Sequence, residues 1–304
     1  MSATRLGLPI DWGKIAPLRL RARVVAEGVY AGLHHSRRRG AGVEFGGQRP
    51  YVPGDDLRFL DRRSLLKHDK LMVREFETDT DRALWLCLDA TLSMSFHGPD
   101  APAAKLAYAA LLGAALARVA ISGGDPVGLC WVGAEQARDL APGTGEGGFE
   151  RVVGTLAAAR AGTDLRRDPD ALARRVRLLA HRARRGSVVV FISDLLDLPA
   201  GAPRAVASLG CRSRALCVVQ VLDPAERLLG YHGKVRLRAI EGDDAVTTDA
   251  DAARAEYLAG LGALTDGWAR AVQAEGGRLV RACSSDPPID VVRDVVRAVA
   301  EARR

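Results

Sequence analysis

The stretch ALWLCLDATLSM, residues Ala83–Met94, decides the fold of this chain. Its first half is an apolar run bounded by polar residues, which predicts a β-strand buried on both faces over 84–88. Its second half places Asp89, Thr91 and Ser93 at alternate positions of the loop that follows the strand. A carboxylate and two hydroxyls are hard oxygen ligands, which suit Mg²⁺ or Mn²⁺ and suit zinc poorly.

Short apolar runs alternate with longer helix-like segments from residue 81 onward. This alternation predicts an α/β fold with a doubly wound, mostly parallel, Rossmann-type sheet. The expected strands are 84–88, 126–132, 187–192, 215–222 and 278–283, with a short strand at 135–140 and a hairpin at 235–240 and 244–248. The expected helices are 102–121, with Pro102 in the first turn, 148–160, 169–185, 200–209, 252–274 and 289–302.

Residues 1–80 have a different character from the rest of the chain. A helix is expected near 17–34, followed by an Arg/His/Gly cluster at 34–42 and then by loops and short strands. We therefore expect two parts: a small N-terminal helix-and-loop region, 1–80, packed on the main domain, and an α/β domain at 81–304.

Composition argues against several classes of protein. The 304 residues are 48% hydrophobic and 27% charged, as in an ordinary globular protein. The net charge of +7 suggests nucleic-acid binding, but the arginines are spread along expected helices, and the compact run 37–39 has no interleaved aromatic residues. We expect no nucleic-acid partner. The five cysteines form no C-x-x-C pair and lie mostly in apolar runs, which favours buried, reduced thiols.

The sequence shows no expected targeting or membrane segment. Residues 1–14 lack the apolar core of a signal peptide. The longest apolar segment, 106–121, is shorter than a bilayer span and contains Arg118. The expectation is a soluble, cytoplasmic protein with no membrane span.

A second strand ends in the same chemistry as the first. Asp194 follows the strand expected at 187–192, and ligands of doubly wound sheets bind at the carboxyl ends of the strands where the strand order reverses. If the two strands are neighbours there, Asp89 and Asp194 face one crevice, and a Gly-Thr loop can bring Thr163 to the same point. The interpretation is a divalent cation site made of Asp89, Thr91, Ser93, Thr163 and Asp194. The alternative for each residue alone is a helix cap or a turn.

These five residues follow the order D-x-[ST]-x-S, then Thr, then Asp. The order resembles the metal-ion-dependent adhesion site of von Willebrand factor A domains, and the resemblance covers most of 81–302. It implies a von Willebrand factor A-like fold and a Mg²⁺ (or Mn²⁺) ion held directly or through water. It also implies that a carboxylate from a partner protein completes the octahedron. That family normally has serine where this chain has Thr91, so the hydroxyl is kept.

The region upstream of the expected domain carries a second resemblance. It contains GAGVEF at 40–45, RPYVPGDDLRFLD at 49–61 and LMVREFE at 71–77. These segments resemble the signature of domain-of-unknown-function family 58, in which they lead into a von Willebrand A-type domain. One departure is Arg62, where the family usually has tryptophan. The resemblance implies a bacterial adaptor protein whose partner is a MoxR-type AAA+ ATPase.

The charged residues of this upstream motif admit two roles. We favour a salt-bridge network that fixes a loop around the Pro-Gly turn, and the alternative is a second surface for a partner. The motif residues are Glu44, Tyr51, Gly54, Asp55, Asp56, Arg58 and Asp61.

Two functions use the expected cation site. The first is a non-enzymatic protein-interaction module that acts as an adaptor. The second is a metal-dependent phosphoester hydrolase, for which Asp197 is the nearby candidate base. The sequence contains neither a G-x-x-x-x-G-K-[ST] motif nor a G-x-S-x-G elbow, and the G-x-G-x-x-G match at 143–148 is expected to be a surface loop.

Overall fold

The computed structural model describes residues 15–33, 45–50, 72–76, 82–134, 138–162, 165, 168, 170–211, 213–240 and 244–302; for 15–17, 31–33, 45–50 and 72–76 it describes the backbone alone. The chain divides into two compact units, one formed by 1–34 together with 81–304 and the other by 35–80. The region expected at 1–80 is therefore split, because its helix belongs to the larger unit.

That helix, α1 (Ile15–Leu33), packs against α3 (Lys105–Ser122) and α9 (Pro288–Ala302). Its buried residues Leu18, Ala22, Val25 and Val29 recur every three or four positions, so they form one apolar stripe along the helix. This stripe joins the main hydrophobic core, which explains why α1 groups with the α/β domain although 46 residues of the other unit separate them in sequence.

The smaller unit contains an antiparallel pair of strands, β1 (Phe45–Pro50) and β2 (Met72–Phe76). The register runs from Phe45 opposite Phe76 to Pro50 opposite Met72, with an irregularity between Phe45 and Gly47. The two strands thus carry parts of the upstream motif. The motif residues Glu44, Tyr51, Gly54, Asp55, Asp56, Arg58 and Asp61, and also Arg62, lie outside the described residues.

A six-stranded sheet with the order β10-β7-β6-β3-β4-β5 forms the centre of the larger unit. All neighbouring pairs are parallel except β4 with β5 (Leu140–Gly143), which is antiparallel. The parallel strands are β3 (Leu84–Asp89), β4 (Val127–Val132), β6 (Val188–Ser193), β7 (Ala215–Leu222) and β10 (Arg278–Cys283). This is the doubly wound, mostly parallel α/β fold that the sequence predicts.

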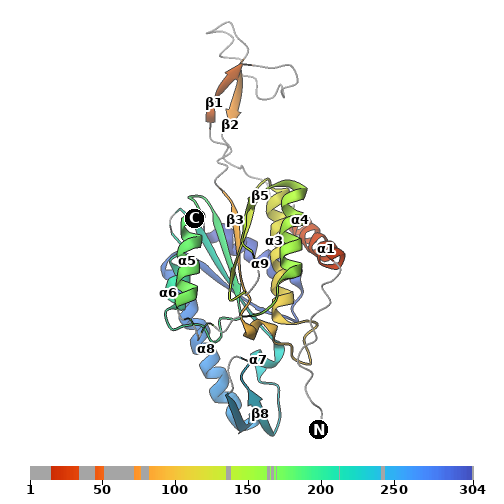
Figure 1. The fold of residues 1–304 in the computed structure, drawn as a ribbon, viewed down its shortest axis with the longest axis vertical. Helices are drawn as coiled ribbons and strands as arrows, with labels where there is room; N and C mark the ends of the chain where they lie inside the picture. Colours follow the sequence, from red (N-terminus) through yellow and green to blue (C-terminus); the bar gives the residue numbers. More distant parts are fainter. Residues whose placement is uncertain are drawn as a thin grey trace. The chain divides into compact units, whose positions relative to one another are not determined.

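Helices cover both faces of this sheet (Figure 1). Side chains of β3 alternate between the faces, with Leu84, Leu86 and Leu88 in one core and Trp85 and Cys87 in the other. The first core includes α1, α3, α9 and α4 (Gly145–Ala158), and the second includes α5 (Asp170–Arg182), α6 (Ala202–Ala207) and α8 (Ala250–Ala274). Because both faces are covered, the central strands are buried at every position, and their apolar residues are continuous rather than alternate.

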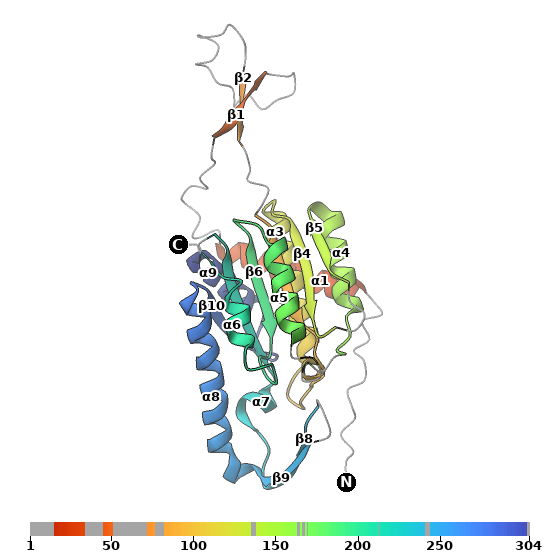
Figure 2. The ribbon, with the colours of Figure 1, turned by 60° about the vertical axis from the view of Figure 1, so that its left-hand side comes forward.

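An additional arm follows β7 at the carboxyl end of the sheet (Figure 2). It consists of the short helix α7 (Pro224–Leu228) and the antiparallel strands β8 (Lys234–Arg238) and β9 (Ala245–Asp249), which form their own two-stranded sheet. The predicted hairpin is therefore present. The arm leads directly into α8, whose first turn is capped by the side chain of Asp249.

Helix α3 begins three residues later than expected, so Pro102 precedes the helix instead of lying in its first turn. By length and composition, α3 could cross a membrane, but 72% of it is buried inside the domain. Its twelve buried residues pack against the sheet and the neighbouring helices, and this accounts for its apolar sequence.

The segment around 135–148 also differs from expectation. The edge strand β5 includes Pro142 and Gly143, whereas these residues were expected to close an earlier strand at 135–140. Proline is tolerated there because an edge strand leaves one side of its backbone unpaired. The glycine-rich match at 143–148 is the connection from β5 into the first turn of α4, and not a free surface loop.

Candidate functional site

The strand order reverses between β3 and β6, the pair at the centre of the sheet. Leu88 lies opposite Ile192 in the parallel register, so Asp89 and Ser193 are the next residues at the carboxyl end of each strand. The connections that follow these two parallel strands run to opposite faces of the sheet, so a crevice opens between them. Doubly wound folds bind ligands in this crevice. The predicted adjacency of the two strands is confirmed.

Asp89 is fully buried in this crevice and both of its carboxylate oxygens accept hydrogen bonds. Oδ1 accepts from the backbone N–H of Thr91 at 2.9 Å, and Oδ2 accepts from the hydroxyl of Ser193 at 2.6 Å. Burial, together with the negative charge of Asp194, raises the pKa of Asp89 to about 6, although the hydrogen bonds oppose this shift. Asp89 is therefore a carboxylate whose charge is poorly compensated by the protein alone.

Thr91 and Ser93 bring their hydroxyls together beside Asp89. Thr91 Oγ1 lies 3.0 Å from Ser93 Oγ, and both residues are buried, at 2% and 5% exposure. Hydroxyls two residues apart can meet here because the chain enters a 3₁₀ turn, η2 (Leu92–Ser95), immediately after Thr91. Two ligands at about 2.1 Å from Mg²⁺ and adjacent in an octahedron lie about 3.0 Å apart, so this separation fits one shared cation.

The backbone at Ala90 and Thr91 is held in place by the end of β4, which passes close to it. Ala90 donates its N–H to the carbonyl of Val132 at 2.8 Å. The next residue, Gly133, has φ +73°, and a Cβ there would lie only 2.9 Å from the backbone nitrogen of Thr91. Only glycine combines this positive φ with such a short contact, so Gly133 helps to fix the position of Thr91.

Asp194 is the second buried carboxylate and follows directly after β6. Its Oδ1 accepts from the N–H of Leu196 at 3.0 Å, and the hydroxyl of Ser193 accepts from the N–H of Leu195 at 2.9 Å. These two bonds hold Leu195 at φ 64°, a left-handed conformation that costs a non-glycine residue about 1–2 kcal/mol. The loop after β6 is therefore shaped by the same side chains that form the site.

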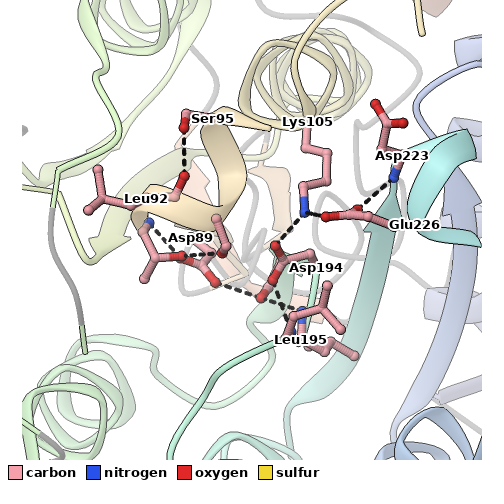
Figure 3. A network of polar contacts seen from close by, with 12 residues as sticks. Asp89, Leu92, Ser95, Lys105, Asp194, Leu195, Asp223 and Glu226 are labelled. Carbon is pink, nitrogen blue, oxygen red and sulfur yellow. Dashed lines mark hydrogen bonds and ion pairs between the residues drawn. The ribbon is translucent and has the colours of Figure 1, made fainter. Parts of the chain in front are cut away.

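A buried lysine completes the site, as Figure 3 shows. The ammonium of Lys105 lies 2.7 Å from Oδ2 of Asp194 and 2.6 Å from Oε1 of Glu226 in α7. Burial alone would lower the pKa of Lys105, but the charges of Asp194 and Glu226 outweigh it and raise the pKa above its usual value. Burial raises the pKa of Glu226, and the charge of Lys105 opposes that shift.

Helix α7 is attached to the site by its own capping residues. Asp223 caps the helix by accepting from Ala225 N–H, and Glu226 returns to accept from Asp223 N–H at 2.9 Å, which makes a capping box. The other oxygen of Asp223 accepts from the N–H of Gly98 at 2.8 Å. Gly98 lies in the segment between η2 and α3, so α7 is bonded both to the Lys105 ammonium and to the loop that follows Ser93.

The residues present fit a small divalent cation. The donor set is two carboxylates and hydroxyls, all hard oxygens, and the two hydroxyls are spaced as adjacent octahedral ligands. No group of three or more His, Cys, Asp or Glu side chains suited to a metal occurs in the described part of the chain, so nothing there resembles a zinc site.

Four of the five residues predicted to hold the cation, Asp89, Thr91, Ser93 and Asp194, meet at this crevice; the fifth, Thr163, lies outside the described residues. Its neighbour Gly162 donates its N–H to the carbonyl of Ala90 at 3.0 Å. Asp197, the candidate base of the alternative function, is exposed, in contrast to the buried carboxylates.

Three residues of the site were missed in the sequence: Ser193, Lys105 and Glu226. The signal for Lys105 was available, because it is one of only five lysines and is the one charged residue in the first turn of an apolar helix. Glu226 gave the sequence signal of a capping box, Asp223-Pro-Ala-Glu226, but nothing local indicated that it reaches across to α3.

The geometry defines a doubly wound α/β domain with an oxygen-rich crevice at its switch point. The chain matches the model of the family described as "Protein of unknown function DUF58" over residues 47–263, and it belongs to that family. It is 30% identical over 300 residues to the uncharacterized protein Rv1480 of Mycobacterium tuberculosis, with 94% of this chain and 88% of the relative covered. The predicted family is therefore confirmed.

Solved structures with a related fold are more distant. One is a von Willebrand factor type A protein from Catenulispora acidiphila, with 14% identity, a TM-score of 0.39, and 76% of this chain and 44% of that chain covered. Another is an aerotolerance-related membrane protein from Bacteroides fragilis, with 16% identity, a TM-score of 0.45, and 72% of this chain and 98% of that chain covered. These similarities concern the fold alone.

The cytoplasmic location predicted from the sequence is corrected by this comparison. A protein that shares the fold is described as a membrane protein, so the absence of a recognised targeting segment was not a sound basis for that prediction. That description is of the Bacteroides fragilis protein.

Proposed function

We propose that this domain is a non-enzymatic protein-interaction module built around a divalent cation site. Mg²⁺, or Mn²⁺ in its place, is held by Asp89, Thr91, Ser93, Thr163 and Asp194, and an open coordination position accepts a carboxylate from a partner protein. The observation that carries the proposal is the pair of hydroxyls of Thr91 and Ser93, 3.0 Å apart beside a buried carboxylate.

The charge of the site supports this proposal. Asp89 and Asp194 are both fully buried, and burial together with the negative charge of Asp194 raises the pKa of Asp89. A cation bound between them removes the repulsion between the two carboxylates. It also compensates for the hydration that the carboxylates lose when they are buried. The helix-cap alternative accounts for single hydrogen bonds, such as that from Thr91 N–H to Asp89, but not for two buried carboxylates at one switch point.

We propose a MoxR-type AAA+ ATPase as the partner, which is the partner implied by the family resemblance. An acidic side chain of the ATPase would supply the last oxygen ligand. Because Asp89, Thr91 and Ser93 are at most 5% exposed, docking of that side chain requires movement of the residues that cover them. Metal-dependent association with a conformational step is therefore the expected behaviour.

The experiment is a binding assay with purified ATPase in Mg²⁺ and in EDTA. Wild-type protein is expected to bind in Mg²⁺ and to lose at least about tenfold in affinity in EDTA, since loss of one coordinated partner group costs about 1.4 kcal/mol or more. Asp89→Ala is expected to bind weakly in both buffers. The matched control is Ser95→Ala, whose exposed hydroxyl contacts the carbonyl of Leu92 and not the site.

Equal affinity of wild type and Asp89→Ala in both buffers would show that no metal bridge exists. Turnover of a phosphoester by the wild-type protein with Mn²⁺, lost in Asp194→Ala, would instead support the hydrolase alternative. Calorimetry with Mn²⁺ alone, without a partner, tests the cation site separately from the identity of the ATPase.

A further inference from the structure

Lys105 is a buried cation in a site whose other charged groups are carboxylates. Its side chain has no exposed surface, and its ammonium contacts Asp194 at 2.7 Å and Glu226 at 2.6 Å (Figure 3). The first carboxylate belongs to the proposed metal site and the second to α7. Lys105 thus directly links the cation site to α7, the first element of the arm of α7, β8 and β9.

Apart from these contacts, the position of Lys105 is unfavourable for a lysine in two respects. It is the first residue of α3, where the positive end of the helix dipole opposes a positive side chain. It is also fully buried, and an ammonium without partners is very costly away from water. A lysine there is retained by its two carboxylate contacts, and the nearby ring of Phe96, 5.7 Å from the ammonium, adds a weaker attraction.

The charges around Lys105 do not balance. The ammonium contacts the carboxylates of Asp194 and Glu226, and two more buried carboxylates, Asp89 and Asp223, belong to the same network of residues. Asp223 accepts from backbone N–H groups, and Lys105 contacts Asp194 and Glu226, but the donors to Asp89 in the described part of the chain are neutral. The cluster therefore keeps a negative excess into which a divalent cation fits, close to a lysine that repels it.

We propose that Lys105 is the internal counter-charge that sets the divalent-cation affinity of this site and transmits its occupancy to α7. This inference rests on the proposed function. A cation bound by Asp194 competes with Lys105 for that carboxylate and repels the ammonium. By reciprocity, the lysine weakens cation binding, and cation binding weakens the contact of Lys105 with Asp194. Because the same ammonium holds Glu226, the change reaches α7.

The first test measures Mn²⁺ affinity of the full chain by calorimetry. Lys105→Met keeps the length of the side chain and removes its charge, so it is expected to tighten Mn²⁺ binding by about tenfold or more. Glu226→Gln removes a negative charge while keeping Lys105, so it is expected to weaken Mn²⁺ binding. Lys234→Met, on the exposed face of β8, is the matched control and should leave the affinity unchanged.

The second test measures whether α7 responds to the cation. Amide hydrogen exchange of 225–229 is expected to change when Mg²⁺ is added to the wild-type protein. The change should be at least halved in Lys105→Met at saturating Mg²⁺. Exchange in α5 provides the internal reference, because α5 packs in the core on the opposite face of the sheet from α3, and the ion pairs of Lys105 among the described residues are with Asp194 and Glu226.

The outcomes separate this inference from the proposed function. If wild type binds Mn²⁺ and Lys105→Met binds no more tightly, Lys105 does not oppose the cation and the inference fails while the proposed function stands. If only Lys105→Met binds Mn²⁺, Lys105 excludes the cation, and both the wild-type metal site and the transmission of its occupancy to α7 are refuted. If neither binds, both are refuted. If circular dichroism shows that Lys105→Met does not fold, the effect of Glu226→Gln on Mn²⁺ affinity decides. Tighter or unchanged Mn²⁺ binding by Glu226→Gln overturns the inference.

Discussion

The hydroxyl of Ser193 donates a 2.6 Å hydrogen bond to Oδ2 of Asp89, across 104 residues of sequence and between the two central strands. With the N–H of Thr91 on Oδ1, this bond fixes the orientation of the carboxylate before any ligand arrives. A site whose ligands are already oriented loses less entropy when it binds. The two halves of the doubly wound sheet are thus joined by a side chain at the point where a ligand would sit.

Replacing Ser193 by alanine is expected to destabilise the domain by about 1–3 kcal/mol, because a buried carboxylate loses its hydroxyl donor and the N–H of Leu195 loses its acceptor. Urea denaturation of the metal-free protein at neutral pH measures this. The control is Ser208→Ala, in which an exposed hydroxyl that bonds the carbonyl of Ala205 is removed, with an expected change within about 0.5 kcal/mol. Equal effects of the two substitutions would contradict a structural role for Ser193.

Gly133→Ala is expected to cost more stability than Gly124→Ala. Both glycines have positive φ, +73° and +88°, so both substitutions carry the left-handed penalty of about 1–2 kcal/mol. A Cβ at Gly124 has nothing within 4 Å, whereas one at Gly133 meets the backbone and methyl group of Thr91. Thermal or urea denaturation should therefore separate the two by about 1 kcal/mol or more. A smaller difference would mean that Thr91 moves freely.

The raised pKa of Asp89 predicts a specific pH dependence in EDTA. With a pKa of about 6 in the folded protein and a lower value when unfolded, the folded state holds the extra proton between about pH 4 and pH 6. Stability from this group is therefore present at low pH and is lost as the pH rises through 6, by about 3 kcal/mol at most. Asp89→Asn removes this contribution, so wild type should lose stability relative to the variant as pH increases.

The pair of hydroxyls on Thr91 and Ser93 predicts which substitutions weaken cation binding. Thr91→Val and Ser93→Ala each remove one oxygen ligand and should weaken Mn²⁺ binding by about tenfold or more, while changing stability only modestly. Ser95→Ala, two residues further along the same turn, should bind as wild type does. Calorimetry on the three variants gives the comparison, and unchanged affinity in both Thr91→Val and Ser93→Ala would remove these hydroxyls from the ligand set.

Much of the fold could be predicted because strands buried on both faces are short and continuously apolar. The run ending at Asp89 and the run ending at Ser193 were both recognisable, and the switch-point rule then placed their ends side by side. The edge strand β5 was misplaced because an edge strand has little apolar patterning and tolerates proline. The start of α3 was misplaced because Pro102 is compatible with a helix start without requiring one.

The contacts to α7 could not be predicted from the sequence. The ammonium of Lys105 reaches Glu226 across 121 residues, and no local pattern encodes such a pairing. The role of Ser193 was hidden for a different reason: a serine at the end of an apolar run usually indicates only that the strand stops. In both cases the chemistry arises from the tertiary arrangement and not from spacing along the chain.

The division of the chain has a practical consequence for work on isolated domains. A recombinant fragment starting at residue 81 contains all six strands of the central sheet. It would nevertheless lack α1, and the apolar surface that Leu18, Ala22, Val25 and Val29 normally cover would be open to water. Aggregation of such a fragment would result from the apolar surface that α1 no longer covers. It would not be evidence against the fold or the metal site.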